Sequence, residues 1–178
     1  LDELPPGRPA IQTTIVALSD RKNTYAHMRT RLDEGRQAYV ICPRIDEPDP
    51  TRFLALNAKS VTEEAKRLKK EIFPKYEIGI LHGKMTPKEK EDVMRAFSEG
   101  DINVLVATSV VEVGVNVPNA TVMVIEGAER FGLSQLHQLR GRVARSTNIP
   151  ECFLFTETKS EATMKRLRAL GQAKNGFE

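Results

Sequence analysis

Short apolar runs alternate along this chain with longer segments in which apolar and polar residues follow a helical period. The short runs are rich in β-branched and aliphatic residues, and several are uninterrupted, which is typical of strands buried on both faces of a sheet. They predict strands at residues 13–17, 37–42, 77–81, 103–107, 121–125 and 152–155. The segments between them predict helices at residues 21–34, 61–73, 87–98, 133–144 and 161–170.

The helix predicted at 87–98 has the clearest boundaries. Thr86 is a suitable N-cap residue, Pro87 occupies the first helical position, and Glu89 completes a capping-box pattern with Thr86. Gly100 stands just beyond the last helical residue, where glycine favours termination. Both ends of this helix are therefore marked by the sequence itself.

The regular alternation of strands and helices predicts an α/β fold. A parallel sheet of about six strands, covered by helices on both faces through right-handed crossovers, is the architecture that accommodates it. Ligands of such sheets bind at the carboxyl ends of the strands. Residues 43–59 have no clear period and contain Pro48 and Pro50, so they predict a long surface loop.

The chain has 178 residues, a length that suits one domain. Residues 1–12 carry several prolines, which exclude a regular helix or a central strand there, and are interpreted as a linker from an upstream domain. Residues 13–172 form the predicted domain, and residues 173–178 are interpreted as the start of a truncated C-terminal extension. The chain starts with leucine, and both ends are expected to be cut from a longer protein.

Composition is that of an ordinary globular protein, with 40% hydrophobic and 29% charged residues. This excludes a disordered chain, and no membrane partner is expected. The net charge of +3 is too small to indicate a nucleic-acid-binding protein by itself, so any basic site must be local. Cys42 and Cys152 lie in apolar runs and are expected to be buried thiols in a reducing compartment. No signal peptide is recognised, which favours a cytoplasmic location in a bacterium.

The strongest local motif lies between Gln138 and Arg145. A helical period places Gln138, Gly141, Arg142 and Arg145 on one face, and it places Leu136, Leu139 and Val143 on another. Paired guanidinium groups beside a glycine suit a phosphate, because the planar fork of arginine binds phosphate oxygens in bidentate fashion and stays charged. From spacing alone, a solvated arginine face is an equally good interpretation.

Polar residues also follow two predicted strands. Thr108 and Ser109 end the run at 103–107, where hydroxyl groups could hold a phosphate or could simply cap the following turn. His82, Gly83 and Lys84 follow the strand at 77–81. An isolated histidine there is more often a structural hydrogen-bonding residue, and no metal site is predicted, because no further ligands stand at metal-binding spacing.

A triphosphate-binding P-loop is absent. Before Gly83 and Lys84 the nearest glycine, Gly79, is one position too close, and Met85 replaces the required hydroxyl residue. The acidic pair at residues 46–47 belongs to the predicted loop and is expected to face water. The chain is therefore not expected to bind and hydrolyse a nucleotide alone.

Taken in order, the motifs at 81–83, 107–118 and 138–145 resemble the carboxy-terminal motifs of superfamily two helicases. The longer string at 128–143 resembles the RecG family of ATP-dependent DNA helicases, which remodel stalled replication forks and Holliday junctions in recombination and repair. The resemblance runs from the proline-rich linker to Phe177 and implies the second RecA-like motor domain. It also implies ATP and Mg²⁺ as cofactors, held mainly by the first RecA-like domain of the same chain.

The resemblance further assigns roles to individual residues. Arg142 and Arg145 match the arginine fingers that act on the transferring phosphoryl group. The nucleotide-facing residues are Gly114, Asn116, Gln138 and Gly141, and the DNA-backbone contacts are His82, Gly83 and Thr108. Branched DNA is the implied partner of a monomeric full-length protein.

Two positions depart from the family pattern. Asn116 stands where the family usually has aspartate, and Ala144 stands where it usually has glycine. Asparagine keeps an acceptor oxygen but loses the charge, and alanine adds a methyl group at a tight place. A transcription-repair coupling translocase and a non-catalytic DNA-binding or interaction module are the alternative interpretations.

Overall fold

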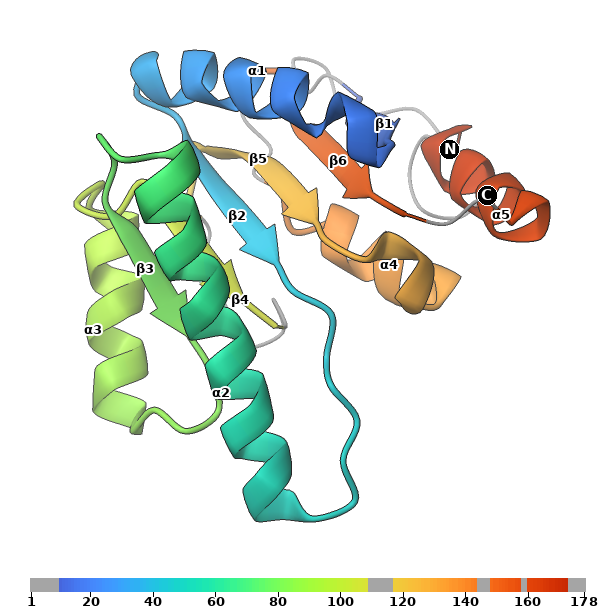
Figure 1. Cartoon of the computed structure of the whole chain (residues 1–178). Helices are drawn as coiled ribbons and strands as arrows, with labels where there is room; N and C mark the ends of the chain where they lie inside the picture. Colours follow the sequence, from blue (N-terminus) through green and yellow to red (C-terminus); the bar gives the residue numbers. More distant parts are fainter. Residues whose placement is uncertain (1–9, 109–116, 144–147, 158–159, 173–178) are drawn as a thin grey trace, which may run out of the picture.

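The computed structural model describes residues 10–108, 117–143, 148–157 and 160–172, and the side chains up to residue 170. Its strands form one six-stranded sheet in the order β1-β6-β5-β2-β4-β3, with every neighbouring pair parallel (Figure 1). The strands are β1 (Gln12–Val16), β2 (Gln37–Ile41), β3 (Ile78–Leu81), β4 (Val104–Ala107), β5 (Ala120–Ile125) and β6 (Glu151–Phe155). Each strand starts and ends within one residue of the sequence prediction, and the expected parallel α/β sheet is confirmed.

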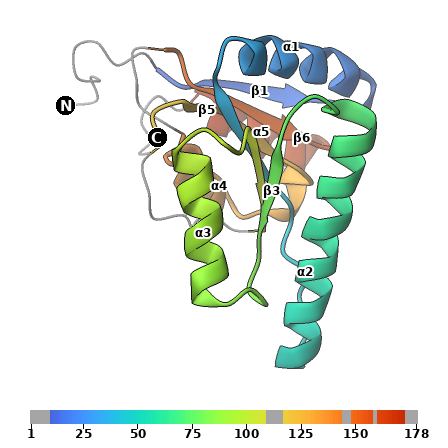
Figure 2. The same ribbon diagram turned by 90° about the vertical axis from the view of Figure 1, so that its left-hand side faces the viewer.

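Helices cover both faces of this sheet. The helices are α1 (Arg21–Asp33), α2 (Pro50–Arg67), α3 (Pro87–Ser98), α4 (Leu133–Arg140) and α5 (Glu161–Gln172), with short turns η1 (Leu18–Asp20), η2 (Leu68–Ile72) and η3 (Ala128–Arg130). α1 and α2 pack on one face, whereas α3, α4 and α5 pack on the other. Figure 2 shows α2 and α3 on opposite sides of β3.

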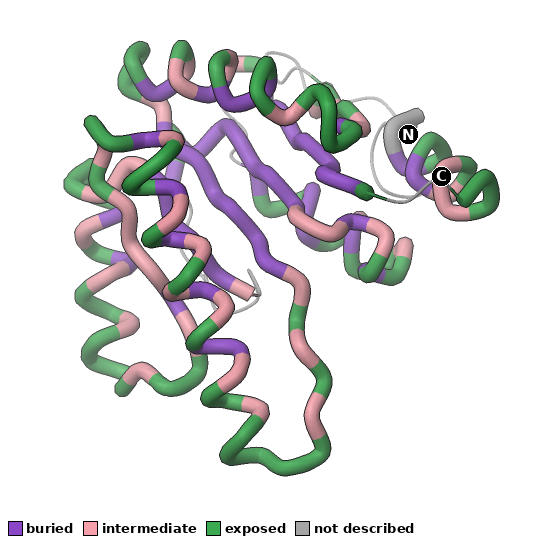
Figure 3. The backbone as a smooth tube through the Cα atoms, in the orientation of Figure 1, coloured by how far each residue is buried: buried purple, intermediate pink, exposed green. Residues whose placement is uncertain are grey.

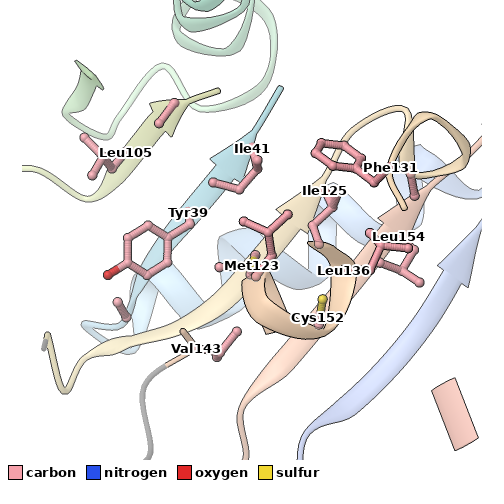
Figure 4. Packing of buried hydrophobic residues seen from close by; sticks show 14 of the residues in the cluster. Tyr39, Ile41, Leu105, Met123, Ile125, Phe131, Leu136, Val143, Cys152 and Leu154 are labelled. Atoms are coloured by element: carbon pink, nitrogen blue, oxygen red, sulfur yellow. The ribbon is translucent and has the colours of Figure 1, made fainter. Parts of the chain in front are cut away.

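The strands form the core because the helices shield them on both faces. All described residues of β2, β4, β5 and β6 are buried, and Figure 3 shows this central layer between partly exposed helices. Tyr39, Met123 and Cys152 project from three strands toward Leu136 of α4 and Val143 beyond it (Figure 4). Cys152 and Cys42 are buried free thiols, as the sequence predicted.

The prediction of a long loop over 43–59 is wrong. After an irregular stretch, α2 begins at Pro50 and continues through the π-helical turn η2. Proline at the first helical position loses no helical hydrogen bond, so Pro50 starts the helix that it was expected to prevent. In Figure 1 the segment after β2 extends beyond the sheet before α2 returns alongside it.

The buried Asn57 ties this segment to α2. Its Oδ1 accepts a hydrogen bond from the Ile45 backbone N–H at 2.9 Å, and its Nδ2 donates to the carbonyl oxygens of Ile45 and Phe53 at 3.0 and 2.8 Å. The side-chain amide thus satisfies both backbone polar groups of Ile45, which lies outside the helices and strands. Residues 43–49 are thereby held against the helix that follows them.

The helix predicted at 133–144 is shorter than expected. α4 ends at Arg140, and Gly141 is its C-cap residue. The backbone N–H groups of Arg142 and Val143 donate to the carbonyls of Leu139 and Arg140, at 3.0 and 3.3 Å, so the chain tightens into a three-residue turn. Glycine disfavours continued helix, which accounts for the early end. Arg142 therefore lies in a turn beyond the helix.

Candidate functional site

The predicted site residues fall into two separate groups. His82 and Gly83 directly follow β3, and Thr108 directly follows β4. Because Leu81 pairs with Ala107 in the parallel β3–β4 register, His82 and Thr108 leave the sheet side by side. This first group lies at the carboxyl edge of the sheet, as the sequence predicted.

His82 is held in a tight turn. Its backbone carbonyl accepts from the Met85 N–H at 3.3 Å, and its ring Nδ1 accepts from the Lys84 N–H at 3.2 Å. Acceptance at Nδ1 places the proton of the neutral ring on Nε2. The turn fixes the imidazole at the end of β3, where the ring is partly exposed.

Gly83 lies under the first half of α2. A Cβ atom at this position would stand 2.7 Å from Cδ2 of Leu54, so the two segments approach closely here. The contact involves the end of a flexible side chain, and Gly83 itself is exposed. Packing against α2 is therefore a second reason for glycine, beside the predicted contact with DNA.

A groove of about 770 Å³ lies between α2 and the turn after β3. Its polar lining comes from Lys59, Thr62, Glu63 and Lys66 of α2 and from His82, Lys84 and Glu89 across it. Lys59 pairs with Glu63 at 3.9 Å, whereas no described carboxylate forms an ion pair with Lys66 or Lys84. The capping-box hydrogen bonds from Thr86 lower the pKa of Glu89 and keep that carboxylate engaged with the helix terminus. Lys66 and Lys84 thus present positive charge beside His82.

The second group lies elsewhere. Gln138, Gly141 and Arg142 are exposed at and beyond the end of α4. Helices between parallel strands run back toward the amino ends, and Arg140 accordingly reaches Thr13 near the start of β1. This group therefore lies toward the amino ends of the strands, away from His82 and Thr108.

The other face of the same segment is buried, as predicted. Leu136, Leu139 and Val143 are 0%, 7% and 1% exposed, and all three pack into the sheet. Arg142 itself is exposed, yet its charge is close enough to act on Tyr39. Burial raises the pKa of the Tyr39 hydroxyl to about 12, and the positive charge of Arg142 opposes that rise.

Among the described residues, none stands too close to Gly141 for a side chain to fit. Its backbone is ordinary right-handed helix, and an added Cβ would stand 3.4 Å from the carbonyl oxygen of His137 and 3.5 Å from that of Gln138. Both are normal contacts. As far as the described residues extend, the surface beside Arg142 leaves room for an outside group to come close to the backbone.

Four predicted positions lie outside the described residues. Gly114 and Asn116, assigned to the nucleotide, fall in the undescribed range 109–116. Arg145, the second predicted arginine finger, and Ala144 fall in the range 144–147.

Sequence reasoning missed a partly buried ionic cluster at the carboxyl end of β5. Arg67 contacts Glu64 at 2.5 Å and Glu126 at 3.8 Å, and the Cys42 thiol donates to Glu126 at 3.6 Å. The cluster borders a cavity of about 580 Å³. The position of Glu126 directly after an apolar strand was the available signal, but the partners come from distant segments.

The two carboxyl groups of this cluster differ in protonation. Desolvation, followed by the hydrogen bond and charge of Glu64, raises the pKa of Glu126 to about 9. Burial opposes ionisation of Glu64 too, but its hydrogen bonds with Glu126 and Arg67 lower its pKa. Glu126 therefore keeps a proton at neutral pH while Glu64 is charged.

The described ranges contain no group of three or more His, Cys, Asp or Glu residues that could hold a metal ion. None of the helices in these ranges is long and apolar enough to cross a membrane.

Comparison with known proteins identifies the class. The helicase conserved C-terminal domain matches residues 21–147. The ATP-dependent DNA helicase RecG of Synechocystis is 48% identical over 177 residues, covering 99% of this chain and 21% of the relative. RecG of Thermotoga maritima is 44% identical over 178 residues, covering 100% of this chain and 22% of the relative.

Solved structures agree with this. The structure of RecG bound to a three-way DNA junction shares 41% identity and a TM-score of 0.79, covering 98% of this chain and 22% of that one. Domain 2 of the DEAD-box helicase Mss116p, bound to an RNA duplex, shares the fold with a TM-score of 0.64, 19% identity, and coverage of 89% of this chain and 59% of that one.

The chain belongs to the family of helicase conserved C-terminal domains, and its sheet is RecA-like. Within that family it is similar to RecG, as the motif at 128–143 predicted. It spans about one fifth of the length of these RecG relatives.

Proposed function

We propose that this domain is the second motor domain of an ATP-dependent DNA helicase or translocase that remodels branched DNA such as stalled forks and Holliday junctions. The observation that carries the proposal is the turn beyond α4, where Gly141 leaves the surface open and Arg142 is exposed beside it. This arrangement suits a phosphate, and the sequence lacks a P-loop to bind one alone. We infer that the nucleotide site is completed by another domain.

The residues present fit one side of an ATP site. Gly141 allows a phosphate close to the backbone, Arg142 offers a guanidinium, and the Gln138 side chain is exposed one helical turn earlier. Bound ATP with Mg²⁺ supplies the phosphoryl group whose hydrolysis releases the energy. The family resemblance assigns Mg²⁺ to the first RecA-like domain. Arg145, Gly114 and Asn116 take their nucleotide-facing roles in this proposal from the family resemblance.

Arg142 acts only when the two motor domains close. An arginine from a mobile partner stabilises the charge that develops on the transferring phosphoryl group, and such a finger typically contributes about 10³ to 10⁵ in rate. Opening after hydrolysis withdraws the guanidinium. Closure and opening then move the DNA-contacting edge relative to the first domain.

The carboxyl edge holds the DNA. His82, Gly83 and Thr108 end adjacent strands there, and Lys66 and Lys84 add positive charge in the neighbouring groove. Lysines attract phosphate without reading sequence, which suits a motor that passes along DNA. The full-length protein is proposed to act as a monomer in the bacterial cytoplasm, where its DNA and ATP are found.

The test is branched-DNA-stimulated ATP hydrolysis by the full-length parent protein at saturating DNA. Arg142→Ala and Arg145→Ala are expected to lower kcat about 10³-fold or more with unchanged fork binding. Arg95→Ala is the control, because Arg95 is an exposed arginine of α3 whose partners are Glu91 and Asp92. Normal turnover by the Arg142→Ala variant would show that Arg142 is not an arginine finger.

Two other outcomes separate the alternatives. A wild-type parent that binds forks without hydrolysing ATP would favour a non-catalytic module in which Asn116 and Ala144 mark a decayed motor. A parent that hydrolyses ATP and requires RNA polymerase to act on DNA would favour a transcription-repair coupling translocase.

A further inference from the structure

Arg140 is a charged residue in an unusual place. It is the last residue of α4 and only 3% exposed, although arginine is rarely buried without a partner. Its Nη1 donates to the carbonyl oxygen of Leu170 in α5 at 2.6 Å and to the hydroxyl of Thr13 in β1 at 3.3 Å. Both of these partners are neutral, and no described carboxylate forms an ion pair with Arg140, so these contacts satisfy donors without neutralising the charge.

The burial of Arg140 is not explained by folding stability alone. Removing a guanidinium from water is costly, and the burial lowers the pKa of Arg140. An apolar side chain of similar length would fill the same space without that cost. The hydrogen bonds of Arg140 are therefore better explained by the orientation that they give to the neighbouring turn.

The cross-link joins three elements that are far apart in sequence. Thr13 belongs to β1, Leu170 to α5, and Arg140 to the start of the turn that carries Arg142. Leu139 and Val143 pack against the sheet on either side of Arg140 in sequence. The turn is thus fixed by apolar packing and by directed hydrogen bonds whose angles leave little freedom of rotation.

We propose that Arg140 is a positioning residue, which orients the turn at 141–143 against β1 and α5 so that Arg142 points out of the domain toward the nucleotide. Arg140 does not contact the nucleotide, since its own side chain is buried. The inference rests on the proposed function for what Arg142 does. The fixed orientation of the turn is a separate claim about this domain.

The experiment uses the full-length parent with Arg140→Met, which keeps the length of the side chain and removes every donor. Hydrogen exchange of the backbone amides of 141–143 is measured first, because those of Gly141, Arg142 and Val143 are hydrogen-bonded within the turn. We expect exchange about 10-fold faster or more, since the turn loses its polar anchor. Unchanged exchange at these amides would overturn the proposal.

Kinetics then separate positioning from general weakening. Arg140→Met should lower DNA-stimulated kcat by up to about 10²-fold, as expected for a misplaced catalytic group, with the KM for ATP little changed. Combining it with Arg142→Ala should add no further loss, because both changes remove the same interaction. Additive losses in the double variant would contradict action through Arg142.

Further variants separate a loss of positioning from a loss of stability. Met28→Ala weakens the core on the α1 face and should lower the unfolding temperature without changing kcat at permissive temperature. If Arg140→Met does not fold, Thr13→Val and Arg140→Lys test the same cross-link, and normal exchange in both would reject it. If Arg142→Ala is fully active while exchange at 141–143 still rises in Arg140→Met, the finger assignment fails and the positioning of the turn stands.

Discussion

Gly141 shows how a single residue can distinguish a structural from a functional requirement. Its backbone is helical and an added Cβ meets no forbidden contact, so Gly141→Ala should leave the unfolding temperature of the domain unchanged or slightly raised. If a phosphate approaches the backbone here, the added methyl should lower DNA-stimulated kcat of the full-length parent by about 10-fold or more. Ser98→Ala on the exposed end of α3 is the control, and a fully active Gly141 variant would show that nothing approaches this surface.

Glu126 gives the domain a pH-dependent stability. Its carboxyl group has a pKa of about 9 when folded and near 4.5 when unfolded, so the folded state keeps a proton that the unfolded chain releases. The free energy of unfolding should therefore fall as pH rises from about 5 to about 9, by up to about 1.4 kcal/mol per pH unit. Glu126→Gln should flatten this slope in denaturant unfolding, whereas the exposed Glu63→Gln should retain it. If the free energy of unfolding falls with pH equally steeply in both variants, the proton retained by the folded state belongs to a group other than Glu126.

At the scale of elements, the sequence predicted more of the fold than of the site. The strands were predictable because burial on both faces leaves continuous apolar runs, and α3 was predictable because Thr86, Pro87 and Glu89 mark its start. The start of α2 was missed because Pro50 was read as a helix breaker. Its anchor, Asn57, gives no periodic signal, since its partners are backbone groups of the preceding segment.

The site was harder to predict because its geometry depends on how the helices pack across the strands. The motif at 138–145 predicted which residues face outward, and Gln138, Gly141 and Arg142 do so. Its position relative to the sheet was not predicted, because the course of α4 across the face depends on its packing with α5 and on the contact of Arg140 with β1. The buried cross-link of Arg140 was likewise invisible until Thr13 and Leu170 were brought beside it.

The groove between α2 and the β3–α3 turn carries a prediction about DNA. Lys66→Ala combined with Lys84→Ala should weaken binding of the full-length parent to forks of different sequence to a similar extent, because lysines contact phosphates rather than bases. The slope of log affinity against log salt should fall in magnitude by about 2, one for each lost contact. Lys22→Ala on α1 is the matched charge control. Unchanged affinity and slope would place the DNA path away from this groove.

At the scale of the whole molecule, the sheet separates two working surfaces. β3, beside the basic groove, is one edge of the sheet, and β1, which Arg140 contacts, is the other. A buried sheet keeps the proposed DNA-contacting edge and the Arg142 turn in fixed relation, so that the proposed closure on a nucleotide would move both together. In the proposed motor, the domain transmits motion that arises from its closure against the first RecA-like domain.

This division of labour predicts that the isolated 178-residue chain does not turn over ATP. It offers Arg142 but no P-loop, so the phosphates lack the backbone cradle that binds them and the nucleotide should stay unhydrolysed with or without branched DNA. The measurement is phosphate release by the purified chain, with Arg142→Ala of the same chain as background. Turnover that exceeds this background and disappears with the arginine would mean that the chain forms a complete active site, and the proposal that another domain completes the nucleotide site would have to be abandoned.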